Sequence, residues 1–197
     1  MKTTSVKGRK QAAKPFGNHS APSVEGMQKF KSPYGYFTQD GREYVITRPD
    51  TPQPWINVLC NGDYGAIISQ TGSGFSWREN SNLSRITRWE QDLVKDEWGK
   101  YIYVRDRESG AFWSLTWKPL KPHFDFFEVR YGQGYAILRS SYDGIEQENT
   151  IFVDREIPVE AWKIRLRNTT PRRRHLSLFT YFEWCLGNAA DTHREFH

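Results

Sequence analysis

The sequence predicts an all-β protein built as an antiparallel β-sandwich. From Tyr34 onward, turn signals recur about every ten residues, a spacing typical of sandwiches and barrels. The runs between these turns either alternate apolar and polar residues or are apolar throughout, as strands are. No stretch has the periodicity of an amphipathic helix. We therefore expect about a dozen strands in this chain.

Five strands are expected in the first half of the chain, at 34–37, 42–48, 55–59, 64–70 and 75–78. Asp40-Gly41 and Asn61-Gly62 connect the first two pairs, and such dipeptides supply the positive φ angles of tight hairpin turns. Pro49, Pro52 and Pro54 then separate the two hairpins, because proline lacks the N–H that a central strand donates.

Five more strands are expected at 101–105, 112–117, 135–142, 145–153 and 159–167. Ser109-Gly110 and Asp143-Gly144 provide the turns within the first four. The run 159–167 alternates strictly, with Trp162, Ile164 and Leu166 on one side and Lys163, Arg165 and Arg167 on the other. That period of two predicts one buried and one solvated face.

The last run, 175–186, differs because apolar residues point to both of its faces. They are Leu176, Leu178, Phe179, Tyr181, Phe182 and Trp184. We expect a strand covered on both sides. The chain also has 28 aromatic residues after residue 31 and stops at His197 without a polar taper. We therefore expect a fragment, or a module whose cover is another domain or subunit.

The basic charge of the protein lies in its first 31 residues. They carry seven lysines and arginines against a single acid, Glu25, whereas the remaining residues carry 21 bases and 22 acids. This tail cannot bury enough apolar area to offset its ordering entropy, so we expect residues 1–31 to be disordered and 32–197 to form the domain. A nucleic-acid-binding arm would use such lysines. We favour a solvated leader, and expect no nucleic-acid partner.

Several classes of protein are excluded by what the sequence lacks. No apolar run approaches the roughly 18 residues of a membrane span, and no apolar segment follows the N-terminal lysines as in a secretory signal. Cys60 and Cys185 are too few for a disulfide scaffold. The sequence has two Gly-x-Gly pairs, at Gly72 and at Gly132. Neither continues into a dinucleotide-binding pattern or a phosphate-binding loop. We expect a soluble cytoplasmic protein without a cofactor.

Polar residues crowd the last seven positions, namely Asp191, His193, Glu195 and His197 around Arg194. Two histidines four residues apart would share one face of a helix, as a zinc pair requires. Arg194 stands where the glutamate of that motif belongs, and a cation beside a metal is unfavourable, so we expect no metal. Two interpretations of these last residues remain open, namely a polar loop that contacts the substrate and a solvated terminus.

The segment from Ser76 to Arg105 is the densest in tryptophan, arginine and carboxylate. Its members are Trp77, Arg78, Arg85, Arg88, Trp89, Glu90, Asp92, Asp96, Glu97, Trp98, Tyr103 and Arg105. Aromatic rings stack on the C–H face of a sugar, while charged groups bond its hydroxyls. The same residues suit a structural network of interstrand ion pairs, which the spacing alone favours.

Several blocks of sequence, taken in order, resemble the cellobiose phosphorylase family, glycoside hydrolase family 94. They are Tyr34-Gly-Tyr-Phe, Arg42-Glu-Tyr-Val-Ile-Thr-Arg-Pro-Asp-Thr-Pro, Pro54-Trp-Ile-Asn, Ile86-Thr-Arg-Trp, Gly99-Lys-Tyr-Ile-Tyr-Val-Arg-Asp, Phe112-Trp and Trp117-Lys-Pro, and Glu128-Val-Arg-Tyr-Gly-Gln-Gly-Tyr. The resemblance covers about Tyr34 to His197 and implies the family's N-terminal supersandwich, which is similar to that of galactose mutarotase.

The resemblance also implies where the chemistry lies. In the family, the catalytic acid and most of the phosphate site belong to an (α/α) barrel that follows this domain, so no catalytic residue is expected here. Members are typically homodimers. A Gln-Arg pair near the acceptor sugar matches His193-Arg194, which makes these two residues the expected substrate contacts. His193 stands where the family has glutamine, so the identity of the acceptor sugar is left open.

Two functions follow from the sequence. The first is the N-terminal sugar-contacting sandwich of an inverting glycoside phosphorylase. The parent enzyme would cleave a β-linked disaccharide or oligosaccharide with inorganic phosphate to give a sugar 1-phosphate. The alternative is a non-catalytic carbohydrate-binding or interdomain structural module.

Overall fold

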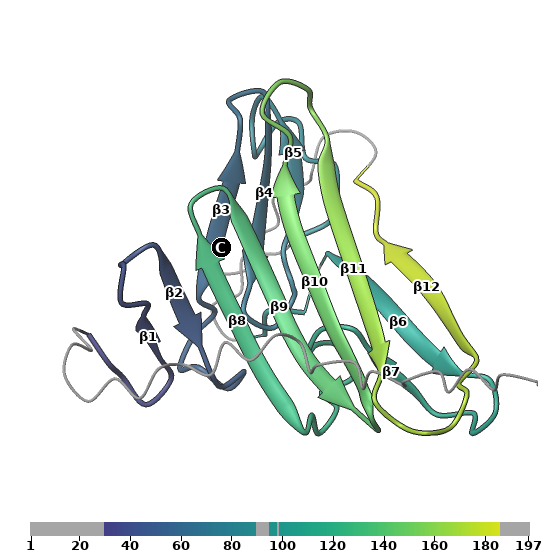
Figure 1. Ribbon diagram of the computed structural model, residues 1–197. Coiled ribbons are helices and arrows are strands. Elements are labelled where there is room, and N and C mark those ends of the chain that lie inside the picture. Colours follow the sequence, from purple (N-terminus) through teal and green to yellow (C-terminus); the bar gives the residue numbers. More distant parts are fainter. Residues whose placement is uncertain (1–29, 90–94, 98, 186–197) are drawn as a thin grey trace, which may run out of the picture.

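The computed structural model describes residues 30–89, 95–97 and 99–185, and within them every regular element is a β-strand. Twelve strands, all paired antiparallel, form three sheets that pack as two layers (Figure 1). The all-β antiparallel sandwich expected from the sequence is thus confirmed. No helix among these residues is long and apolar enough to cross a membrane.

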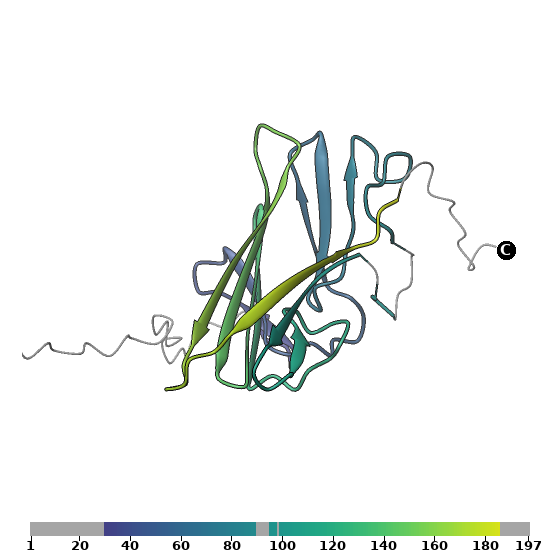
Figure 2. The ribbon, with the colours of Figure 1, turned by 90° about the vertical axis from the view of Figure 1, so that its right-hand side faces the viewer.

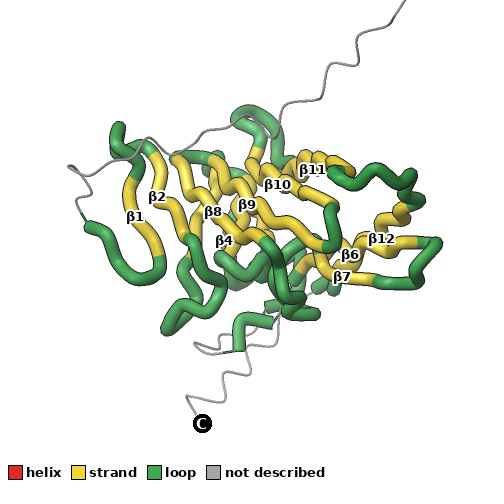
Figure 3. The backbone as a smooth tube through the Cα atoms, turned by 60° about the horizontal axis from the view of Figure 1, so that its bottom comes forward, coloured by secondary structure: helices red, strands yellow, loops and turns green. Residues whose placement is uncertain are grey.

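One layer is a six-stranded sheet in the order β1-β2-β8-β9-β10-β11. Its strands are β1 (Gly35–Phe37), β2 (Glu43–Ile46), β8 (Phe126–Gly132), β9 (Tyr135–Tyr142), β10 (Ile145–Val153) and β11 (Glu160–Asn168). Figure 3 shows these strands side by side in one row. β9 and β10 have the bounds that the sequence predicts, and Asp143 and Gly144 both adopt positive φ in the turn between them. β8 was not predicted as a strand.

The other layer consists of two three-stranded sheets, β3-β4-β5 and β12-β6-β7, seen from the side in Figure 2. Their strands are β3 (Ile56–Cys60), β4 (Tyr64–Ser69), β5 (Ser76–Arg78), β6 (Lys100–Asp106), β7 (Phe112–Ser114) and β12 (Leu176–Phe182). The predicted strand 112–117 ends early, because the chain turns away after Ser114.

Two apolar clusters fill the space between the layers. One joins β3 and β4 to the large sheet and contains Ile46, Leu59, Ile68, Val129, Ala136, Leu138 and Ile151. The other joins β6 and β7 to the large sheet and contains Ile102, Val104, Trp113, Leu115 and Ile145. Trp162, Ile164 and Leu166 pack against these clusters, so the predicted alternation of 159–167 is confirmed. Each sheet therefore buries one face, as the period of two requires.

β12 forms within the run 175–186, which was expected to be covered on both sides by another domain or subunit. In the chain alone Leu178, Phe179, Tyr181 and Phe182 are all exposed, and the expected cover stays a prediction. β12 ends its sheet, and of the described strands only β6 pairs with it. The described residues therefore do not supply the cover that its composition calls for.

The predicted disorder of residues 1–31 falls almost wholly on residues that the structure does not describe, so it remains a prediction. Of that segment only Phe30 and Lys31 are described. The ring of Phe30 contacts Phe37 edge-on, with 6.1 Å between centroids.

Candidate functional site

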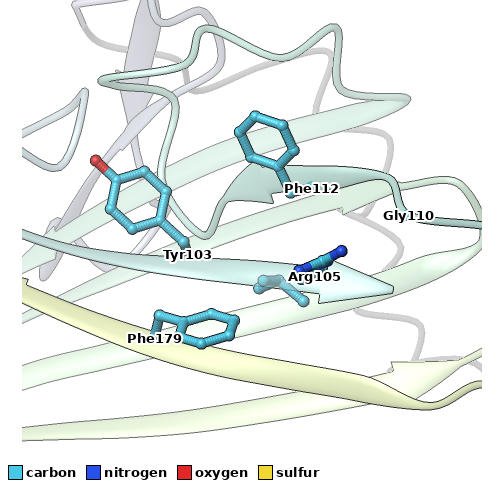
Figure 4. Close-up of a pocket in the computed structure, with 6 residues that line it drawn as sticks. Tyr103, Arg105, Gly110, Phe112 and Phe179 are labelled. Atoms are coloured by element: carbon cyan, nitrogen blue, oxygen red, sulfur yellow. The ribbon is translucent and has the colours of Figure 1, made fainter. Parts of the chain in front are cut away.

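An open groove of about 490 Å³ lies on the outer face of the sheet β12-β6-β7. Figure 4 shows its main side chains, Tyr103 and Arg105 from β6, Phe112 from β7 and Phe179 from β12. Val104 and Gly110 complete the lining. Three aromatic rings therefore surround one guanidinium.

The register of the three strands brings these residues together. Phe179 pairs with Tyr103 across the β12–β6 ladder, and Phe112 pairs with Arg105 across the β6–β7 ladder. Paired residues share a face of the sheet, and alternate residues take the other face. Val104 thus points into the core while its neighbours Tyr103 and Arg105 point outward.

The groove offers apolar surface and hydrogen-bond donors. Phe112 is 62% exposed and Phe179 is 52% exposed, which is unusual for phenylalanine. The Tyr103 hydroxyl is protonated at neutral pH and can donate, and burial raises its pKa further. The structure gives the Arg105 side chain no hydrogen-bond or ion-pair partner among the described residues. Aromatic faces and free donors can hold a sugar ring, or another apolar surface with polar edges.

Tyr103 and Arg105 belong to the segment that the sequence predicts to be either sugar-binding or structural, whereas Phe112 and Phe179 lie outside it. The signal that could have found Phe179 is the alternation of 175–186, which places Phe179 and Tyr181 on one face. Which face points outward depends on the pairing with β6, and no local pattern reveals that pairing.

Several described charges in the segment from Ser76 to Arg105 are bound to charged or polar partners elsewhere in the fold. Lys100, on β6, forms a buried ion pair with Glu160 of β11 and also donates to the Ser76 hydroxyl at 2.7 Å. Ser76 in turn donates to Glu160 at 2.6 Å. The Trp162 indole donates to the same carboxylate at 2.5 Å. This cluster connects strands of both layers, as a structural network does.

Electrostatics within this cluster follow from its burial. Burial lowers the pKa of Lys100, against the attraction of Glu160. Burial also opposes ionisation of Glu160, but Lys100 and the hydrogen bonds from Ser76 and Trp162 outweigh it and hold the pKa of the carboxyl below its usual value. Each charge is therefore retained in the interior by the other.

Other charged residues of the segment are engaged in the same way. The hydroxyls of Ser69 and Thr71 donate to Asp96 at 2.7 and 2.6 Å. The Arg85 guanidinium lies over the rings of Phe75 and Trp89. Glu90, Asp92 and Trp98 lie outside the described residues. The contacts that can be seen fit the structural interpretation of this segment.

The expected substrate contacts His193 and Arg194 lie outside the described residues, as do Asp191, Glu195 and His197. Their proposed roles therefore stay predictions. Among the residues that the structure describes, no group of three or more histidine, cysteine, aspartate or glutamate side chains could hold a metal ion.

Comparison with known proteins identifies the family. Residues 42–197 match the sequence model described as glycosyl hydrolase 94, supersandwich domain. The chain is 38% identical over 159 residues to N,N'-diacetylchitobiose phosphorylase of Vibrio furnissii, covering 80% of this chain and 20% of that protein. It is 39% identical over 149 residues to 3-O-beta-D-glucopyranosyl-beta-D-glucuronide phosphorylase of Paenibacillus borealis, covering 76% and 18%.

A third relative is the cyclic beta-(1,2)-glucan synthase NdvB of Rhizobium meliloti, 37% identical over 166 residues, which cover 83% of this chain and 6% of that protein. The chain thus spans about a fifth of the length of the phosphorylases that it matches. The family match covers most of the twelve-stranded sandwich, in agreement with the resemblance seen in the sequence. The chain belongs to the glycosyl hydrolase 94 supersandwich domain family.

Proposed function

We propose that this chain is the N-terminal sugar-contacting sandwich of an inverting glycoside phosphorylase. The observation that carries the proposal is the family match over residues 42–197, together with relatives that are named phosphorylases. The parent enzyme would cleave a β-linked disaccharide or oligosaccharide with inorganic phosphate and release a sugar 1-phosphate. Neither a metal nor a cofactor takes part in this proposal.

Inversion requires that a carboxylic acid protonate the leaving oxygen while the nucleophile attacks the opposite face of the sugar. In this proposal the acid belongs to the barrel of the parent enzyme and phosphate is the nucleophile. This chain holds the sugar in place, and correct placement alone can supply a large part of a rate enhancement. The proposed parent enzyme is a homodimer, as the resemblance implies, and we place it in the cytoplasm.

We assign the described part of the sugar contact to the groove on β12-β6-β7. Phe112 and Phe179 offer ring faces to the C–H side of a sugar, and Arg105 offers several N–H donors to its hydroxyls. His193 and Arg194 remain proposed contacts to the acceptor sugar, on the strength of the Gln-Arg pair that the family carries there.

Titration of the purified chain with N,N'-diacetylchitobiose and cellobiose, followed by NMR, tests the groove. We expect shifts at Tyr103 and Phe179, and affinity at least about tenfold weaker in Arg105→Ala, because one lost hydrogen bond to a charged group costs about 1.5–3 kcal/mol. Phe30→Ala, at a phenylalanine that is 78% exposed and lies outside the groove, is the control. Unchanged spectra at saturating sugar would remove the groove from the proposal.

A second candidate is a structural module between domains. It is favoured by the ion pair of Lys100 with Glu160 and by the hydroxyl hydrogen bonds to Asp96, which engage these charges inside the fold and not with a ligand. For this function, Arg105→Ala and Phe179→Ala would alter the stability of the parent protein and leave sugar affinity unchanged. Melting curves measured beside the titration separate the two functions.

A further inference from the structure

The strand β12 has one edge that no strand among the described residues occupies. β12 stands at the end of its sheet, in the order β12-β6-β7. His175 accepts a hydrogen bond from the backbone N–H of Arg107 at 2.8 Å, and the register pairs Phe179 with Tyr103. In an antiparallel ladder only alternate residues bond to the partner strand. The backbone groups of Leu178, Thr180 and Phe182 therefore point away from β6, toward the free edge.

This free edge carries none of the features that normally protect one. Exposed edges are kept from pairing by short strands, charged side chains or proline. β1, β5 and β7 have three residues each, and β11 carries Lys163, Arg165 and Arg167 on its outer face. β3 begins two residues after Pro54. β12 has seven residues, Leu-Ser-Leu-Phe-Thr-Tyr-Phe, with neither charge nor proline.

Apolar side chains are also exposed on both faces of β12. Leu178 pairs with the buried Val104 and so points to the inner face, yet it is 46% exposed. Phe182 shares that face and is 37% exposed. Phe179 and Tyr181 are exposed on the outer face. Trp184, just beyond the strand, stacks on Phe182 with 5.4 Å between ring centroids. A neighbouring strand would place its own side chains beside those of β12 on both faces at once.

We propose that the free edge of β12 binds one further strand, supplied by polypeptide of the same parent protein outside this chain. The phosphorylase relatives are about five times as long as the segment that matches, so such polypeptide is available. Covalent linkage raises its effective concentration at β12 far above that of a second copy of the domain. The incoming strand carries apolar residues on both faces and places no proline where it bonds to Leu178, Thr180 or Phe182.

This proposal rests on family membership and not on sugar contact. Amide hydrogen exchange of the 197-residue chain, compared with that of the full-length parent protein, tests it. In the chain alone, the amides of Leu178, Thr180 and Phe182 should exchange quickly, whereas those of Phe179 and Tyr181 are protected by β6. In the parent protein, the first three amides should slow by at least about 100-fold. Equal exchange in both proteins would overturn the proposal, whatever the sugar titration shows.

Two variants separate the free edge from the paired edge. Thr180→Pro removes an N–H that points to the free edge, so it should lower the melting temperature of the parent protein and change that of the chain alone little. Tyr181→Pro removes an N–H directed at β6 and should lower both. Equal effects of Thr180→Pro on the two proteins would contradict the proposal. Sedimentation of the chain as a dimer, with the slow exchange already present in that dimer, would assign the edge to a second copy instead.

Discussion

At the residue scale, the most costly arrangement in the domain is the buried pair of Lys100 and Glu160. Both side chains are more than nine-tenths inaccessible to water, and the hydroxyl of Ser76 and the indole of Trp162 complete their hydrogen bonding. Removing one charge from such a pair leaves the other unpaired in the interior. The pair joins β6 in one layer to β11 in the other, so its loss should affect the packing of the whole sandwich.

We therefore expect Glu160→Gln to lower the free energy of unfolding by about 3 kcal/mol. Arg48→Ala is the control, because Arg48 forms an exposed pair with Asp50 and its loss should cost less than about 1 kcal/mol. Urea denaturation measures both values. Equal losses in the two variants would show that the buried pair does not stabilise the fold. The double variant Lys100→Met, Glu160→Gln should recover part of the loss, since no unpaired charge remains.

Asp106 gives the stability a defined pH dependence. The backbone N–H of Glu108 and the guanidinium of Arg174 hold the pKa of Asp106 below its ordinary value of 3.8. A carboxyl with a lower pKa in the folded state stabilises the protein above the unfolded pKa, and this contribution disappears as pH falls through the folded pKa. Asp106→Asn should thus lower the melting temperature at pH 7 more than at pH 3.

Melting curves of wild type and Asp106→Asn at pH 7, 5 and 3 check this expectation. The difference between the two proteins should be similar at pH 7 and 5 and should narrow at pH 3. Asp50→Asn serves as the comparison, because the pKa of Asp50 is also lowered by its hydrogen bond from Arg48, but at an exposed site. If the difference in melting temperature between wild type and Asp106→Asn stayed constant down to pH 3, the charge of Asp106 would contribute nothing to stability.

At the scale of the elements, the outer face of the six-stranded sheet carries a ladder of alternating charges across five strands. In spatial order its members are Glu43, Arg130, Glu128, Arg139, Glu148 and Arg165. Neighbours along the ladder lie 2.7–3.5 Å apart, and all but Arg165 are at most 29% exposed. Cross-strand pairs of opposite charge stabilise sheets and fix their register.

Arg139 bonds to Glu148 at 2.8 Å and lies 3.4 Å from Glu128, whereas among the described residues Arg165 pairs only with Glu148, at 3.5 Å. Arg139→Ala should therefore cost about 1 kcal/mol, and Arg165→Ala less than about half of that. Urea denaturation at low and at high salt measures the difference, which should shrink as salt screens the charges. Equal losses of unfolding free energy in Arg139→Ala and Arg165→Ala would argue that the ion pairs of the ladder do not stabilise the sheet.

The sequence was most informative where the structure depends on neighbours along the chain. Asp143-Gly144 and the alternation from Trp162 to Leu166 are local signals, and both predicted the observed strands. The apolar composition of β12 indicated a strand that needs cover from another domain or subunit, and its exposure among the described residues agrees with that expectation, while the cover itself stays a prediction. The groove could not be assembled from sequence either, since Phe112 and Phe179 meet only through the register of β6 with two partners.

At the scale of the whole molecule, the two outer faces of the sandwich differ in kind. One presents the charge ladder, whose members satisfy one another, and the other presents Tyr103, Phe112, Phe179 and Tyr181. An exposed apolar surface of this kind marks an interaction site more often than a solvent-facing wall. We therefore expect the face formed by β12, β6 and β7 to be turned toward the sugar and the other domains of the parent protein.

The last prediction concerns activity. We expect the 197-residue chain alone to release no sugar 1-phosphate from N,N'-diacetylchitobiose, cellobiose or other β-glucosides in the presence of phosphate. Inverting cleavage needs a proton donor on one side of the glycosidic oxygen and a bound nucleophile on the other. The family resemblance places the donor in a barrel domain, and this chain matches only about a fifth of its phosphorylase relatives. Phosphate-dependent release of a sugar 1-phosphate by the purified chain, lost on heat denaturation and undiminished by further purification, would show that a complete catalytic site lies within these residues.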